Sequence, residues 1–159
     1  MANPAILQRI HAILEAYELP DGEEPYFTKI YPGHPLTLPP MDKLCAYWWE
    51  RREESTVGPG TMHSNAYTYV VRVKCFWLQS PIEEAVDNRE LDVFVIQEDL
   101  PEEFQQDATL AALVTPPVRI GSVMGDAIDR FPETERARTT RTFEFEILLE
   151  NLDGGTRHA

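Results

Sequence analysis

Hydrophobic residues near the N-terminus recur at helical spacing. In the stretch NPAILQRIHAILEAY they return every three or four positions, which predicts an amphipathic helix. Asn3 is suited to cap this helix, and Pro4 is suited to its first turn. The apolar side of the predicted helix comprises Ile6, Ile10, Ile13, Leu14 and Tyr17.

Later stretches alternate between hydrophobic and polar residues, as strands with one buried side do. The longest is AYTYVVRVKCFWLQ at 66–79, which spans about 45 Å if extended and so projects beyond the core. LCAYWW pairs with it as an antiparallel hairpin, YFTKIY forms a short strand, and PVRIGSVMG and TTRTFEFEILLEN form a final hairpin. The expected buried positions are Tyr67, Tyr69, Val71, Val73, Cys75 and Trp77 in the long strand, and Phe143, Phe145, Ile147 and Leu149 in the last.

A helix is predicted between these hairpins, over SPIEEAVDNRELDVFVIQ. Ser80 serves as its N-cap, Pro81 occupies the first position, and Glu83 completes a capping box. DLPEEF starts a separate turn, and DATLAALV forms a short capped helix that ends before two prolines. The inner stripe of the central helix is expected to comprise Ile82, Val86, Val93 and Phe94.

These elements predict one α+β domain over residues 1–159. Its mostly antiparallel sheet has about four to five strands and packs with the N-terminal and central helices. Long hairpin loops project at Arg51–Asn65 and Asp126–Arg138, and a flexible tail starts at about residue 152. We expect the proline-rich PGHPLTLPP to be an extended connector, because four prolines forbid helix and central strand alike.

Composition narrows the classes of function. The 159 residues carry a net charge of −13, which disfavours sequence-independent attraction to nucleic-acid phosphates. Ten carboxylates and one arginine lie between Pro81 and Asp107. No window approaches the roughly 18 apolar residues that span a bilayer, and the N-terminus does not resemble a signal peptide, so we expect a cytoplasmic protein with no membrane contact.

Candidate catalytic residues are few. Cys45 and Cys75 are outside any CxxC pair, and we expect both to be buried free thiols. The four histidines are not at metal-ligand spacing, so no metal or cofactor is expected. A small enzyme or ligand-binding domain remains an alternative, with His63 beside either cysteine as its site.

The stretch KLCAYWWERREE joins adjacent aromatic rings to a run of charge. Three locations are compatible with Trp48 and Trp49: an active site, the core or a subunit interface. Since neighbouring residues of a strand point to opposite faces, one ring is expected in the core and the other at a subunit contact. The second face of the sheet then needs a cover, either another helix of the same chain or a partner subunit.

The order of these elements resembles the tail terminator proteins of long-tailed bacteriophages. The resemblance rests on AILQRIHAIL, the link HPLTLPP, the long strand YTYVVRVKCFWL, the capped helix, ATLAALV and RTFEFEILLE, and it covers roughly Ala5 to Glu150. It implies a non-enzymatic homo-hexameric ring that caps the tail tube, ends tube polymerisation and provides the surface on which the head docks. The implied partners are the tail tube protein and a head–tail connector or neck protein.

On this reading the protein is made in the host cytoplasm and resides at the head-proximal end of the tail. DNA passes through the ring without specific binding, past an acidic lumen for which we select Glu83, Glu84, Asp87 and Glu90. The interface candidates are Trp48, Trp49, Arg51, Arg52, His63, Arg130, Arg136, Arg138 and Arg141. A head–tail connector or tail completion protein is the alternative within the same class.

Overall fold

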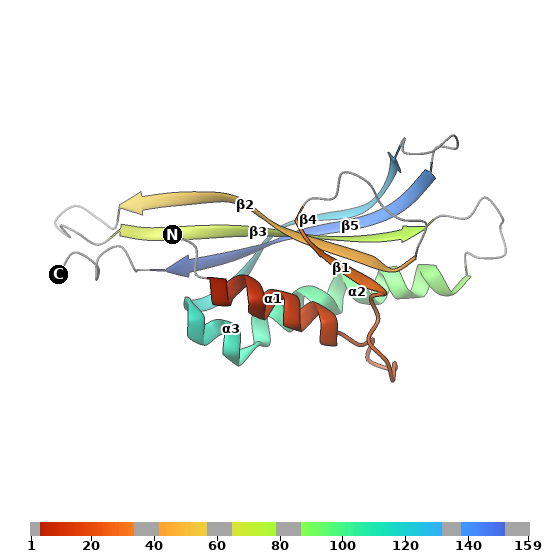
Figure 1. Ribbon diagram of the computed structural model, residues 1–159, viewed down its shortest axis with the longest axis horizontal. Helices are drawn as coiled ribbons and strands as arrows, with labels where there is room; N and C mark the ends of the chain where they lie inside the picture. Colours follow the sequence, from red (N-terminus) through yellow and green to blue (C-terminus); the bar gives the residue numbers. More distant parts are fainter. Residues whose placement is uncertain (1–3, 34–41, 57–64, 79–86, 132–137, 152–159) are drawn as a thin grey trace.

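A five-stranded sheet forms one layer of the molecule, and the helices form the other (Figure 1). The computed structural model describes residues 4–33, 42–56, 65–78, 87–131 and 138–151. The α+β class, the element order and the mostly antiparallel sheet are confirmed, whereas the long hairpin loops are not. Within the described ranges the elements are α1 (Pro4–Ala16), β1 (Lys29–Pro32), β2 (Leu44–Thr56), β3 (Asn65–Leu78), α2 (Asp87–Gln106), α3 (Ala108–Leu113), β4 (Thr115–Phe131) and β5 (Arg138–Asn151).

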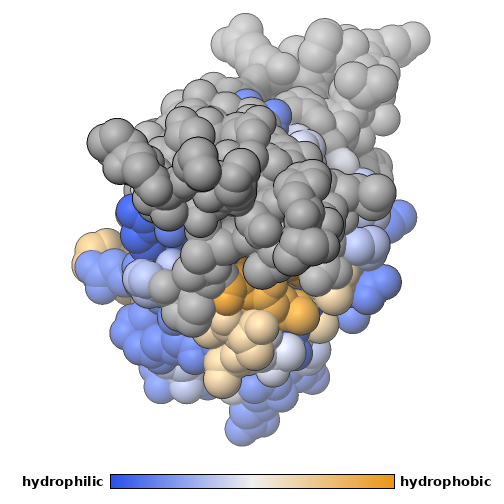
Figure 2. Space-filling model, turned by 90° about the vertical axis from the view of Figure 1, so that its left-hand side faces the viewer, coloured by the Kyte–Doolittle hydropathy of each residue, from blue (hydrophilic) through white to orange (hydrophobic). Residues whose placement is uncertain are grey.

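The strands lie in the order β1-β2-β3-β5-β4. β1 runs parallel to β2, and every other pair is antiparallel. β2 and β3 pair from Leu44↔Phe76 to Thr56↔Asn65, which confirms the predicted hairpin. At one end these strands extend past the helices (Figure 1). Seen from that end, hydrophobic residues gather on the surface among hydrophilic ones (Figure 2).

The core lies between the sheet and the helices, as the alternation predicts. Alternate residues from Tyr69 to Trp77 on β3, and from Phe143 to Leu149 on β5, are buried in it. The predicted inner side of α1 is buried in full, and α1 begins at Pro4. Asp107 caps α3 by accepting a hydrogen bond from the backbone N–H of Leu110, which confirms the short capped helix.

The central helix differs from the prediction. α2 runs from Asp87 through Pro101 to Gln106 as one helix, so the separate turn expected at DLPEEF is wrong. Pro101 lacks the N–H of an interior turn, but the buried stripe continues across it and keeps the helix packed. That stripe comprises Val93, Ile96, Leu100 and Phe104. Phe94 is 63% exposed, which corrects its assignment to the inner side, and Ser80, Ile82 and Val86 lie outside the described residues.

The described residues of both expected loops are strand. β2 continues through the charged residues to Thr56, and β4 continues to Phe131, with Arg138 opening β5 directly opposite it. The backbone pairing of β4 with β5 shifts register three times, and such bulges interrupt the strict alternation that identifies a strand from sequence. Residues 57–64 and 132–137, the proline-rich stretch at 34–41 and the tail from 152 lie outside the described residues.

Candidate interaction groove and charged sheet face

A groove of about 500 Å³ opens between α1 and the end of β1. Its walls are mainly apolar and aromatic, and its polar groups are few, as is typical of sites that receive another molecule or side chain. The lining residues are Leu7, Gln8 and His11 of α1, Pro32 and Gly33 after β1, and Tyr47, Trp48 and Trp49 of β2.

The groove lies where β2 loses its neighbour. β1 pairs with β2 only as far as Pro32↔Tyr47, and the backbone N–H of Gly33 then donates to the Tyr47 carbonyl at 2.8 Å. Gly33 has a φ of 134°, a conformation that disfavours any residue with a Cβ. Beyond it, no strand in the described part of the chain pairs with the outer edge of β2. The edge of a sheet is a place where another chain adds by backbone pairing.

A hydrogen-bond chain ties α1 to β2 inside the groove. The two ring nitrogens of His11 lie 2.9 Å from the Tyr47 hydroxyl and 2.8 Å from a Glu15 carboxylate oxygen. Because an ionised carboxylate only accepts, the His11 Nε2–H donates to Glu15, and in a neutral ring Nδ1 accepts from Tyr47. Burial raises the pKa of Tyr47, so its hydroxyl keeps its proton and is a poor nucleophile. This chain of hydrogen bonds positions α1 against β2.

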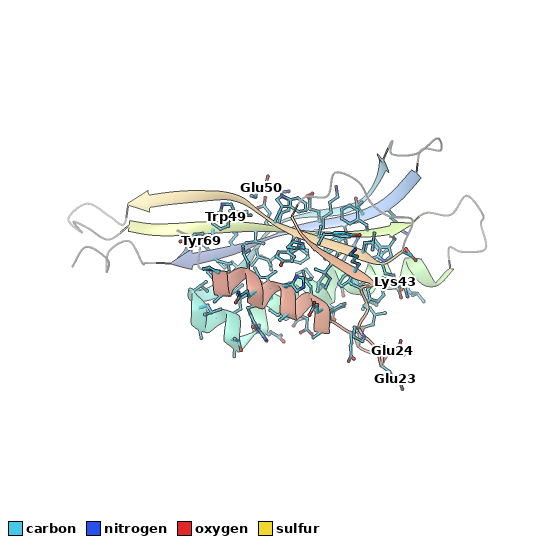
Figure 3. The ribbon with its side chains drawn as sticks, viewed as in Figure 1. Glu23, Glu24, Lys43, Trp49, Glu50 and Tyr69 are labelled. Atoms are coloured by element: carbon cyan, nitrogen blue, oxygen red, sulfur yellow. The ribbon has the colours of Figure 1, made fainter. Side chains whose placement is uncertain are left out.

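The two adjacent tryptophans lie on opposite faces of β2, as expected. Trp49 packs against the main core and contacts the Tyr69 ring in a tilted arrangement with centroids 4.9 Å apart, whereas Trp48 packs on the other face. Figure 3 shows Glu50 on the side of the sheet away from the helices, where the Trp48 indole N–H donates to it at 2.7 Å. Both rings remain partly exposed, and Trp49 is the one that packs against the main core, whereas the subunit contact expected for the other ring stays a prediction.

The face of the sheet away from the helices carries paired charges. Arg72 on β3 hydrogen-bonds Glu146 on β5, and its guanidinium also lies 3.5 Å from Glu144 and 3.7 Å from Glu50. The Arg72 Nε is buried and makes no hydrogen bond within the described residues. One arginine thus faces three carboxylates, so the centre of this face is polar.

A small apolar cluster borders this charged ladder. Leu44, Ala46 and Phe76 are buried together, and Trp48 packs on them. The helices all lie on the opposite side of the sheet in Figure 1, so the helical cover considered for this face is absent from the described part of the chain. The apolar groove, rather than the polar centre of the sheet, therefore has the composition of a contact surface.

The other predicted site residues are dispersed. In the backbone register, Arg51 pairs with Val70 and Arg52 with Tyr69, so both lie in the projecting part of β2. Arg130 and Arg138 lie in the β4–β5 ladder, where Arg141 pairs with Ile128 and with Trp77 of β3. Asp87 and Glu90 lie in the first turns of α2. Four candidates lie outside the described residues: His63, Glu83, Glu84 and Arg136.

The cysteines are close together. Cys45 and Cys75 face each other across β2 and β3, and both are fully buried free thiols, as predicted. Burial raises the pKa of Cys45, as does the adjacent Cys75 thiol, which makes it a weak nucleophile in the folded chain. A pairing of either cysteine with His63 is untested, because His63 is not described.

Metal-binding clusters and membrane-spanning helices are both absent from the described residues. Within the described residues, no group of three or more His, Cys, Asp or Glu side chains is arranged to hold a metal ion. No described helix is long and apolar enough to cross a membrane.

Sequence reasoning missed His11 and Tyr47 as groove residues, since a histidine at one helix position carries no signal of what lies above it.

Comparison with known proteins adds no identification: no protein-family model matches the chain, and no curated protein matches its sequence.

Proposed function

We propose that this chain is a structural protein of a bacteriophage particle. It assembles as a hexameric ring on the end of the tail tube, ends tube polymerisation and provides the surface on which the head docks. The order of helices and strands on which the resemblance to tail terminator proteins rests is also the order of the folded chain. Its partners are further copies of itself, the tube protein and a connector or neck protein.

The observation that carries the proposal is the groove beside the outer edge of β2. Tyr47, Trp48 and Trp49 supply aromatic surface there, and aromatic residues are enriched in the centres of protein interfaces. The adjoining strand edge supplies backbone hydrogen-bonding groups. An apolar segment from a second copy fits both features, and a head-to-tail contact of this kind closes into a ring when the rotation allows it.

Charge supports the same function. The chain carries −13, so a ring of identical copies has a strongly negative field that repels DNA phosphates. DNA then passes through the opening without adhering to the wall.

The alternative of another class, a small enzyme, is favoured by the Tyr47–His11–Glu15 chain in the groove. Two observations weigh against it. The pKa of the Tyr47 hydroxyl is raised rather than lowered, and the Glu15 side chain is 64% exposed, so water competes for the carboxylate that would orient the histidine.

The test is the mass of the protein in solution by light scattering, with negative-stain images of the same sample alone and mixed with short tail-tube fragments. We expect sixfold rings, or sixfold density on tube ends. A protein that stays monomeric and ignores the tubes would refute the proposed function. Rings that bind connector preparations but not tubes would instead indicate a neck protein.

A matched pair of variants tests the groove itself. Gln8 lines the groove and Gln105 lies on α2, and both are exposed helix residues, so Gln8→Arg and Gln105→Arg add the same charge without entering the core. We expect Gln8→Arg to lose the ring and Gln105→Arg to keep it, with equal unfolding midpoints in urea. Rings from both variants would show that the groove is not the contact between copies.

A further inference from the structure

The centre of the β2–β3 hairpin holds two thiols that no proposed contact uses. Cys45 and Cys75 are direct cross-strand partners in the antiparallel pair, and neither has any exposed surface. Both belong to the cluster between the sheet and the helices, so their side chains lie on the same face of the sheet. The two residues are thirty positions apart in sequence, and only the register of the hairpin brings them together.

The backbone geometry of such a pair is close to that of a disulfide. Directly opposed residues in an antiparallel pair have Cα atoms about 4.5–5.5 Å apart, within the range that disulfides occupy. Their Cβ atoms are normally about 4.5–5.5 Å apart, and a disulfide draws them to roughly 3.5–4.5 Å. The strands therefore need to approach only slightly for the bond to form.

We propose that Cys45 and Cys75 are a modification site at which a disulfide-class oxidant such as oxidised glutathione forms a reversible cross-strand disulfide. One cysteine, as its thiolate, attacks the sulfur–sulfur bond of the oxidant, giving a mixed disulfide and one glutathione thiolate. The second thiolate attacks the protein sulfur of that mixed disulfide, which forms the Cys45–Cys75 bond and expels the second glutathione. The two protons lost by the cysteines end on two glutathione thiols, which take up the two electrons.

Burial controls when this reaction occurs. Exchange requires a thiolate and access for the oxidant. Burial raises the pKa of Cys45, and neither Cys45 nor Cys75 has exposed surface, so the folded core resists the reaction. The pair therefore reacts during folding or during local opening of the hairpin. The bond then ties β2 to β3 a few residues from Tyr47 and Trp49, which line the groove. The chemistry of the thiol pair is independent of ring assembly.

The test is to refold the reduced, unfolded chain in a glutathione buffer, quench with an alkylating reagent and measure the mass. We expect a monomer lighter by two hydrogen atoms, with no added alkyl group and a peptide that links Cys45 to Cys75 after proteolysis. Cys75→Ser should instead trap one glutathione on Cys45, and Cys45→Ser one on Cys75. A wild-type product with two free thiols, two glutathiones or an intermolecular bond would overturn the proposal.

A second measurement asks whether the bond is compatible with the fold. The oxidised chain should unfold at a higher urea concentration than the reduced chain, and a reductant should abolish the difference, because the link restricts the unfolded chain. The double variant Cys45→Ala/Cys75→Ala should show no change with reductant. An oxidised chain less stable than the reduced one would mean that the bond forms only in a non-native chain, which also overturns the proposal.

Discussion

Asp107 links α1 and α3 through one carboxylate, so its replacement should weaken both the packing of α1 and the capping of α3. Its two oxygens accept from the Arg9 guanidinium at 2.6 and 2.9 Å, and one of them also accepts from the Leu110 N–H at 2.7 Å. The two hydrogen bonds from Arg9 hold α1 against the start of α3, and the hydrogen bond from Leu110 caps α3. Asp107→Ala removes all of them and leaves Arg9 without this partner.

The structure sets the size of the effect. Replacing an N-cap residue with alanine costs about 1 kcal/mol. The ion pair adds about 1 kcal/mol, the upper end for exposed pairs, because the Asp107 side chain is only 15% exposed while that of Arg9 is 34% exposed. We therefore expect a loss of about 2 kcal/mol in the free energy of unfolding, or a fall in Tm of roughly 4–8 °C for a chain of this length.

Urea denaturation followed by far-UV circular dichroism measures the loss. Asp107→Asn keeps an oxygen for the Leu110 N–H but loses the charge, so it should lose about half as much as Asp107→Ala. Arg9→Ala and the double variant complete a mutant cycle that isolates the ion pair. The reasoning is refuted if Asp107→Ala changes stability by less than about 0.5 kcal/mol, the range of ordinary surface substitutions.

The same carboxylate gives a pH dependence of definite sign. The hydrogen bond from Arg9 is the main cause that lowers the pKa of Asp107 below its ordinary value of 3.8. Its contribution is therefore fully present above that value and is lost as pH falls through the lower pKa of the folded state. The stability difference between wild type and Asp107→Asn should be constant near neutral pH and shrink below about pH 4. A difference that grows on acidification would contradict this assignment.

Three further substitutions test the packing. A Cβ at Gly121 would lie 3.0 Å from a Glu146 oxygen, so Gly121→Ala should destabilise the fold by about 1 kcal/mol through crowding, measured in urea; unchanged stability would show that β5 yields freely. Phe94→Ser should stay within about 0.5 kcal/mol of wild type, since Phe94 is exposed, whereas Ile96→Ala should cost about 2–5 kcal/mol. Equal losses in these last two variants would reverse the assigned faces of α2.

The elements that sequence predicted well are those with one buried side. Every second residue of β3 and of β5 packs in the core between the sheet and the helices, and α1 buries one stripe, so each leaves its period in the sequence even though Val70 and Phe76 of β3 are buried as well. Where a segment is a strand because its neighbours pair with it, its sequence does not alternate between hydrophobic and polar residues. β2 stays a strand through Arg51 and Arg52 because β3 pairs with it there.

The candidate site was harder to predict for a related reason. The groove combines residues from α1, the end of β1 and β2, whose proximity depends on how the helix lies on the sheet. Trp48 and Trp49 were found because adjacent aromatic rings are conspicuous in a sequence. The facing of Cys45 and Cys75 depends on a register that the intervening residues do not fix.

The acidic α2 in the helix layer and the open face of the sheet differ in charge balance, and this difference bears on the orientation of the proposed ring. α2 carries seven carboxylates and one arginine, whereas the open face of the sheet balances its acids with Arg72, Lys74 and Arg119. A wall that repels DNA needs an unbalanced negative surface rather than paired charges, since paired charges cancel beyond roughly one Debye length of about 10 Å. In the ring that we propose, α2 therefore suits the lumen better than the open face of the sheet does. The Asp87 and Glu90 positions at the start of α2, selected from sequence for this role, belong to that helix, and the exposed Glu98 and Glu102 extend its acidic surface.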